Sequence, residues 1–121
     1  MKNGGINQSN IRYSEHWSIL KFVKNDETLY RLLSTTSDDF FDRWRLNSGI
    51  INYIIHDDYV DFHGYSGSIY RCNLSDEGFT LFMKDISVKW NMRFPQSDSL
   101  INEIKFDQFI QEWKTHKPRW N

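Results

Sequence analysis

The chain has 121 residues, a formal net charge of −1 and a hydrophobic share of 39%, with 17% aromatic side chains. This composition fits one folded domain and excludes an intrinsically disordered chain. No run approaches the roughly 20 consecutive apolar residues that a membrane helix needs, so we expect a cytoplasmic protein without a membrane span. Cys72 is the only cysteine, which excludes an intrachain disulfide and favours a buried, unreactive thiol.

The first 13 residues predict a flexible N-terminal arm, because they are rich in Asn, Gly and Ser and their apolar side chains form no face. Two runs typical of β-strands follow, 17–24 and 28–34, separated by the polar residues 25–27. This arrangement predicts a β-hairpin.

Residues 37–46 allow two interpretations. A Ser or Asp cap before aromatic residues at positions 40, 41 and 44 predicts a short helix. Such a short helix is marginal alone and needs tertiary contacts along its aromatic face. The alternative is an extended strand from Phe41 to Leu46, leading into the turn Ser48-Gly49.

The central stretch predicts a second hairpin, with strands at Ile50–His56 and Tyr59–His63 and a turn at Asp57-Asp58. This register places His56 opposite Tyr59, Ile54 opposite Asp61 and Asn52 opposite His63. One face of the hairpin is then polar, and the other is apolar, formed by Ile51, Tyr53, Ile55, Val60 and Phe62. A slip of one residue would bury Asp61, so we expect a well-determined register.

Three further strands are expected after the second Ser-Gly turn, Ser66-Gly67. They lie at 68–72, at 79–84 and from Ile86 to Phe94, where apolar and polar residues alternate strictly. Pro95 ends the last of them, because proline has no N–H to donate to a neighbouring strand.

The C-terminal region predicts a helix from Asp107 to about His116, with Phe109, Ile110 and Trp113 turned inward. The apolar residues within 98–105 fall on the opposite side of the same helical wheel, which favours a break before the helix. Whether residues 98–116 form one helix or two segments stays open.

Together these elements predict an α+β fold with a mainly antiparallel sheet of about five to seven strands, a short helix after the first hairpin, and a C-terminal helix packed on one face. The expected single domain spans 14–117, and the basic end 118–121 is expected to fray.

His56, Asp61 and His63 are the clustered imidazole and carboxylate groups of the sequence. Such groups can bind zinc or act as acid and base. No CxxC or HExxH motif completes a ligand set, so we expect a solvated acidic face, no metal and no cofactor. An enzyme that uses these three residues is the third functional hypothesis.

The two Ser-Gly turns support a second hypothesis, a module that binds a nucleotide or other small anion. Backbone N–H groups in such turns can point at phosphate or carboxylate oxygens. The candidate ligand-binding residues are Arg45, Ser48, Gly49, Ser66, Gly67, Ser68 and Arg71.

The first hypothesis is a non-enzymatic protein that covers a protein partner with an acidic surface. Residues 25–80 hold ten acidic and four basic side chains, which favours a basic partner such as a nuclease. Basic and aromatic residues within 84–93 face opposite sides of a strand, so direct nucleic-acid binding is not expected; the sequence leaves the oligomeric state open. The candidate partner-binding residues are Asp38, Asp39, Asp42, Asp57, Asp58, Tyr59, Asp61, Tyr65, Asp76 and Glu77.

The segments WRLNSGI and HGYSGSIYRC, within residues 44–72, resemble a recurring pattern in small uncharacterised proteins of phage and bacterial genomes. The resemblance implies an accessory protein of a phage or mobile element, acting in the host cytoplasm. Small proteins of that kind often resemble anti-defence inhibitors or immunity proteins. The resemblance assigns no role to any residue.

Overall fold

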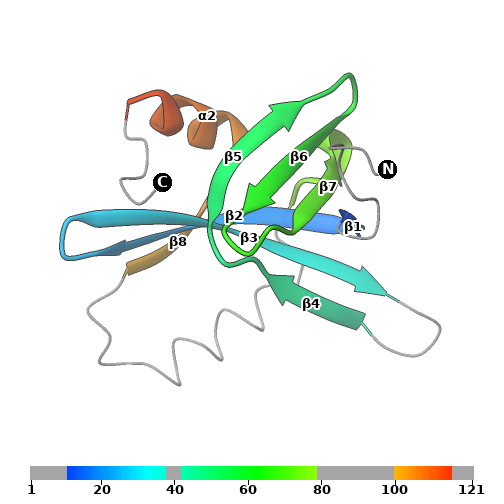
Figure 1. The fold of residues 1–121 in the computed structure, drawn as a ribbon, viewed down its shortest axis with the longest axis horizontal. Coiled ribbons are helices and arrows are strands. Elements are labelled where there is room, and N and C mark those ends of the chain that lie inside the picture. The colour runs from blue at the N-terminus through cyan, green and yellow to red at the C-terminus, as the bar shows by residue number, and fades with distance from the viewer. Residues whose placement is uncertain (1–10, 38–41, 79–99, 116–121) are drawn as a thin grey trace, which may run out of the picture.

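The computed structural model describes residues 11–37, 42–78 and 100–115. Within these ranges the chain forms eight strands, one short 3₁₀ helix and one α-helix (Figure 1). In chain order they are β1 (Ile11–Ser14), β2 (His16–Lys24), β3 (Glu27–Ser37), β4 (Asp42–Leu46), β5 (Ile50–Ile55), β6 (Tyr59–Gly64), β7 (Ile69–Asn73), η2 (Leu74–Asp76), β8 (Leu100–Ile104) and α2 (Phe106–Thr115).

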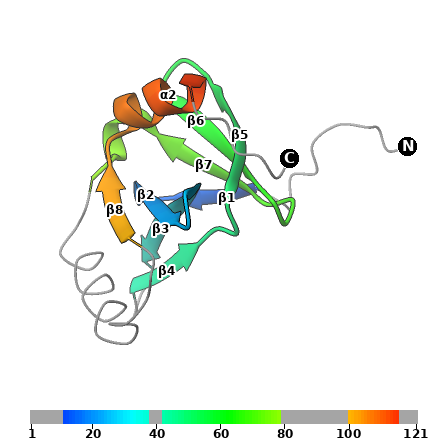
Figure 2. The ribbon, with the colours of Figure 1, turned by 90° about the vertical axis from the view of Figure 1, so that its left-hand side faces the viewer.

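The eight described strands form two sheets of four, where the sequence predicted one sheet of about five to seven strands. Sheet A has the order β1-β7-β6-β5 and sheet B the order β4-β3-β2-β8, and Figure 2 shows sheet A lying across sheet B with α2 beside both. All neighbouring strands are antiparallel except β1 and β7, which are parallel. The chain passes from one sheet to the other at Glu15 and again at residues 47–49. Gly49 has a φ of 139°, in the region that favours glycine, and this conformation allows the second crossing.

The first predicted hairpin is confirmed. Strands β2 and β3 pair from His16 opposite Thr35 to Lys24 opposite Glu27. Asn25 and Asp26 form the turn with φ values of 52° and 67°. Two left-handed residues are typical of the tight hairpin turn that matches strand twist, and Asn and Asp tolerate this conformation best after glycine.

The short helix predicted within 37–46 is wrong, and the alternative strand is confirmed for the described residues 42–46. Strand β4 pairs with β3, placing Trp44 opposite Thr35 and Leu46 opposite Leu33. Pairing with β3 satisfies backbone groups that a marginal one-turn helix would leave unpaired at its ends. Trp44 is 42% exposed, so its ring does not supply the buried aromatic face that the helix required.

The register of the central hairpin is confirmed, with Ile54 opposite Asp61 and Asn52 opposite His63. Val60 and Phe62 are fully buried, as expected for the apolar face. Ile55, assigned to the same face, is 49% exposed because it lies at the far end of the strand, beyond the core. The pairing shifts between Ile50 and Asn52, which leaves the intervening Ile51 out of regular register.

The predicted break before the C-terminal helix is also confirmed. Strand β8 pairs with β2, and α2 begins at Phe106, one residue earlier than expected. Phe109 and Trp113 are buried, and Ile110 packs against the core while partly exposed. The backbone N–H of Phe106 donates to Glu77 Oε2 at 2.6 Å, so this carboxylate satisfies one free donor at the start of the helix.

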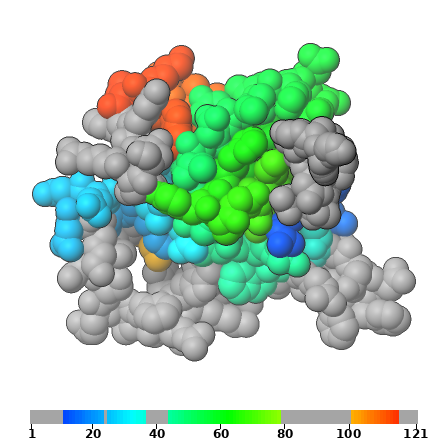
Figure 3. All heavy atoms as spheres, in the orientation of Figure 1, coloured from blue at the N-terminus to red at the C-terminus, as the bar shows by residue number. Residues whose placement is uncertain are grey.

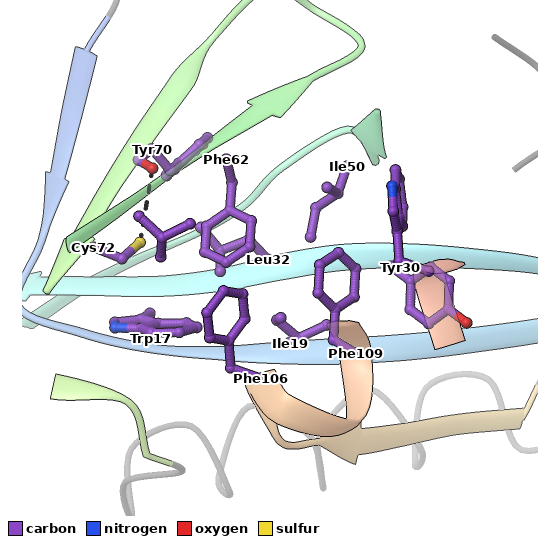
Figure 4. Packing of buried hydrophobic residues seen from close by; sticks show 12 residues of the cluster. Trp17, Ile19, Tyr30, Leu32, Ile50, Phe62, Tyr70, Cys72, Phe106 and Phe109 are labelled. Carbon is purple, nitrogen blue, oxygen red and sulfur yellow. Dashed lines mark hydrogen bonds between the residues drawn. The ribbon is translucent and has the colours of Figure 1, made fainter. Parts of the chain in front are cut away.

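The core lies between the two sheets and α2 (Figure 4). The ring of Phe109 contacts that of Tyr30 edge-on at 5.2 Å between centroids, and Trp17 lies 5.4 Å from Phe62. These contacts join the helix, sheet B and sheet A through aromatic side chains. The buried members are Trp17, Ile19, Tyr30, Leu32, Ile50, Val60, Phe62, Tyr70, Cys72, Phe106, Phe109 and Trp113.

The N-terminal boundary of the domain differs from expectation. Residues 11–13, assigned to the flexible arm, belong to β1, which pairs with β7 from Ile11 opposite Ile69 to Ser14 opposite Cys72. The strands expected at 79–84 and 86–94 and the frayed end 118–121 lie outside the described residues.

Candidate functional site

Strand register places four side chains in a row across sheet A. Tyr13 on β1 is opposite Arg71 on β7, Arg71 is opposite Asp61 on β6, and Asp61 is opposite Ile54 on β5. Because successive side chains of a strand point to opposite sides, and Val60 and Phe62 enter the core, this row lies on the other side of the sheet. We call this side the outer face, formed by Tyr13, Ile54, His56, Tyr59, Asp61 and Arg71.

The turn between β6 and β7 sets this register. Gly67 donates its N–H to the carbonyl of Gly64 at 3.0 Å, and Gly64 donates to the carbonyl of Ser68 at 3.0 Å. Gly67 has a φ of 92°, which side-chain-bearing residues rarely adopt. The second Ser-Gly turn therefore brings Asp61 beside Arg71.

Asp61 is buried and paired, which corrects the expectation of a solvated carboxylate. It is only 2% exposed, although it lies on the outer face. Arg71 donates Nε to Oδ1 and Nη2 to Oδ2, both at 2.9 Å, and His56 Nε2 lies 3.3 Å from Oδ2. Burial alone would raise the pKa of Asp61, but the hydrogen bonds and charge of Arg71, helped by His56, lower it below its usual value.

Aromatic rings hold Arg71 and His56 in place around Asp61. The guanidinium carbon of Arg71 lies 4.6 Å from the ring centroid of Tyr59 and 5.9 Å from that of Tyr13. The imidazole of His56 stacks on Tyr59 with 4.3 Å between centroids and an interplanar angle of 23°. Hydrogen bonding to Asp61 raises the pKa of Arg71. The polar groups at the centre of the outer face therefore have fixed orientations.

Apolar and acidic groups surround this fixed centre. Tyr13 is 59% exposed and Ile54 45% exposed. At one end of the sheet, the hairpin turn exposes Asp57 and Asp58, and the carbonyl of Asp58 accepts the N–H of Leu74 at 2.9 Å. This bond brings the turn close to η2, which contains Asp76. We call Asp57, Asp58 and Asp76 the acidic tip. The turn between β5 and β6, which contains Asp57 and Asp58, projects from the body of the molecule in Figure 1.

The remaining predicted partner-binding residues do not join this surface. Asp42 begins β4 in sheet B, and Asp38 and Asp39 lie outside the described residues. Glu77 accepts the N–H of Phe106, and burial raises its pKa. Tyr65 is 43% exposed on the turn after β6. The structure thus brings together part of the predicted set: Asp57, Asp58, Tyr59, Asp61 and Asp76.

The two Ser-Gly turns lie side by side. Ser48 Oγ accepts the N–H of Ser66 at 3.0 Å, and the carbonyl of Gly49 accepts the N–H of Tyr65 at 3.1 Å. The structure does not direct Arg71 of the predicted anion site at these turns. Arg71 is bonded to Asp61 on the outer face, and Arg45 belongs to β4 of sheet B.

The His/Asp set is brought together only in part. His56 contacts Asp61, whereas His63 Nε2 is buried and has no hydrogen-bond partner among the described residues. Within the described ranges, no group of three or more His, Cys, Asp or Glu side chains is placed to hold a metal ion. Cys72 is buried and burial raises the pKa of its thiol to about 12.

The sequence alone missed Tyr13 and Ile54 as parts of this surface and missed the pairing of Arg71 with Asp61. Tyr13 fell within the supposed arm. A signal for the ion pair was present, because a tight turn at Ser66-Gly67 places residues about five positions before and after it opposite each other.

Comparison with protein-family models, with curated proteins and with solved structures finds no match to this chain. Among residues 11–37, 42–78 and 100–115, no helix is long and apolar enough to cross a membrane.

Proposed function

We propose that this protein is a non-enzymatic binding protein that covers a protein partner with its outer face. The acidic tip directs a basic surface of that partner to the face. The segments that resemble phage and bacterial accessory proteins suggest the setting: an anti-defence or immunity-like inhibitor in the cytoplasm of the host cell.

The observation that supports this proposal most is the combination of exposure and order on the outer face. Tyr13 and Ile54 are exposed beside Arg71, Tyr59 and His56, whose orientations are fixed by contacts with Asp61 and with each other. Tyrosine and arginine are enriched among residues that dominate binding energy in protein interfaces. A face whose side chains are already ordered loses less conformational entropy when a partner binds.

The charge of the acidic tip favours a basic partner. Asp61 is neutralised by Arg71, so the acidic character at the end of the face comes from Asp57 and Asp58, which are exposed, and from Asp76, whose Oδ2 accepts a hydrogen bond from the Asn73 side chain. Exposed charges at the rim of an interface act mainly on the rate of association and are weakened by salt.

The small-anion hypothesis is less favoured, because Arg71 already uses two donors on Asp61 and is not directed at the Ser-Gly turns. An enzyme based on His56 and Asp61 is also less favoured, because both oxygens of Asp61 are held by Arg71.

The proposal is tested by comparative capture from a lysate of the native host, followed by quantitative mass spectrometry. The baits are the wild-type chain, Tyr13→Ala, the double variant Asp57→Lys/Asp58→Lys, and the control Asn102→Ala on strand β8 of sheet B. We expect a basic protein that wild type and Asn102→Ala retain and that both outer-face variants lose. A partner retained equally by all four baits would contradict the proposed surface.

A further inference from the structure

The two sheets have four edge strands within the described residues, and one of them differs from the others. The edges are β1 and β5 in sheet A and β4 and β8 in sheet B. Strand β1 contains Arg12, β4 contains Arg45 and β8 contains Glu103. Strand β5, with the sequence IINYII, contains no charged residue. Charged side chains on edge strands protect soluble proteins from pairing with another strand, so β5 lacks this protection.

The hydrogen bonding of β5 to β6 leaves its other edge without a paired strand among the described residues. His56 donates its N–H to the carbonyl of Tyr59 at 2.8 Å, and the pairs Ile54–Asp61 and Asn52–His63 follow at intervals of two residues. In an antiparallel ladder the backbone groups of the intervening residues point the other way. The N–H and C=O groups of Tyr53 and Ile55 therefore face away from β6, which is the only strand paired with β5 in the described part of the chain.

The side chains at this edge are apolar and exposed. Ile54, on the outer face, is 45% exposed, and Ile55, on the opposite side of the strand, is 49% exposed. The register shift after Ile50 limits the regular edge to the segment from Asn52 onward. Strand β5 (green) contributes to the surface beside the orange-red helix in Figure 3.

We propose that β5 pairs antiparallel with β5 of a second copy of this chain, about a two-fold axis at Ile54. Tyr53 then bonds to Ile55 of the second copy, the two Ile54 side chains meet on the outer face, and Asn52 faces His56 of the second copy. This register uses the backbone groups that face the free edge and covers both exposed isoleucines.

The absence of charge favours a second copy as the occupant. In a segment that pairs with its own copy about a two-fold axis, a charged residue lies close to the same charge of the second copy, and like charges opposite each other destabilise a strand pair. Strand β5 contains no charged residue, so this repulsion does not arise when it pairs with a second β5. The acidic turns do not oppose pairing, because the two Asp57 residues lie about 20 Å apart along the strands, beyond the Debye length of about 8 Å at physiological salt. The pairing would also make the two outer faces continuous, presenting Tyr13, Arg71 and their symmetry mates to one partner.

Sedimentation velocity of the purified chain tests the pairing independently of any partner. We expect the mass to rise with concentration from the 14.6 kDa of the single chain to twice that value. Ile55→Lys, at an exposed position, should stay monomeric while its circular dichroism matches wild type, and the matched control Asn102→Lys on β8 should still associate. A wild-type mass that stays at 14.6 kDa up to about 1 mM chain would overturn the proposal, as would association that Ile55→Lys leaves unchanged.

A cysteine variant tests the register directly. Ile54 and Ile54 of the second copy form a non-hydrogen-bonded pair, whose Cα atoms are about 4.5 Å apart, within the range that a disulfide spans. Ile54→Cys should therefore give a covalent dimer on mild oxidation, while Asn102→Cys should not; the native Cys72 is fully buried. Equal cross-linking of the two variants would refute the two-fold axis at Ile54.

Discussion

The ion pair between Asp61 and Arg71 should be a large source of stability that depends on both partners. Arg71→Ala removes two charge-assisted hydrogen bonds of 2.9 Å and leaves a carboxylate that is 2% exposed with only the weaker contact to His56. Removal of one member of a buried pair costs about 3–5 kcal/mol. Because His56 remains and Arg71 is partly exposed, we expect about 3 kcal/mol.

This loss of free energy corresponds to a measurable change in melting temperature. With an unfolding entropy of about 2.1 cal/mol/K per residue, a chain of 121 residues loses about 4 °C per kcal/mol, so Arg71→Ala should melt about 12 °C below wild type. The control is Arg45→Ala, an exposed arginine on β4, which should change the free energy of unfolding by less than about 0.5 kcal/mol. Urea unfolding at pH 7 measures the change in the free energy of unfolding for both variants.

The pH dependence gives a second check on the same pair. Because the folded-state pKa of Asp61 is lowered, its contribution to stability is present above the unfolded-state pKa of about 3.9 and is lost as the pH falls through the folded value. In Arg71→Ala this acid-dependent loss should disappear. The double variant Asp61→Leu/Arg71→Met should recover most of the lost stability, since it leaves no buried unpaired charge. If Arg71→Ala and Arg45→Ala have equal stability, the reasoning about the buried pair is refuted.

The remaining predictions concern the packing of the fold and its acid stability. Phe62→Ala should cost about 3–5 kcal/mol in urea unfolding, because Phe62 is fully buried beside Trp17; a cost below about 1 kcal/mol would show that this ring is not in the core. Gly49→Ala should destabilise by more than about 1 kcal/mol, because its φ is 139° and a Cβ there would lie 2.8 Å from Leu29 Cδ1. Burial would raise the pKa of Glu112, but hydrogen bonds from Lys21, Gln108 and Tyr30 and the charge of Lys21 lower it to about 2. The contribution of Glu112 to stability should therefore be present above about pH 4.5 and be lost as the pH falls towards 2. Glu112→Gln should flatten the stability profile over that interval, and an unchanged profile would contradict the assignment.

Local patterns predicted the hairpins and the C-terminal helix, because the determinants of those elements are close in sequence. The β-branched and aromatic residues on both sides of the Asp57-Asp58 turn were sufficient for the register of β5 and β6. The apolar spacing of Phe109 and Trp113 was sufficient for the orientation of α2.

The features that sequence could not supply depend on contacts between distant segments. The apolar residues of β1 form no periodic face, and its strand exists because its backbone pairs with β7, some 58 residues later along the chain. The burial of Asp61 is different, because it depends on Arg71 only ten residues later on β7, and the Ser66-Gly67 turn offered a local signal for this pair that the sequence prediction missed. The local sequence around residues 42–46 predicted a marginal helix, but pairing with β3 makes these residues a strand.

Binding kinetics with the captured partner test the central claim most directly. The account predicts that Asp57→Lys/Asp58→Lys slows association and weakens its salt dependence, that Tyr13→Ala speeds dissociation, and that Asn102→Ala matches wild type in both rates. If the partner binds all four proteins with the same two rate constants, the outer face is not the binding surface and the proposed function is wrong.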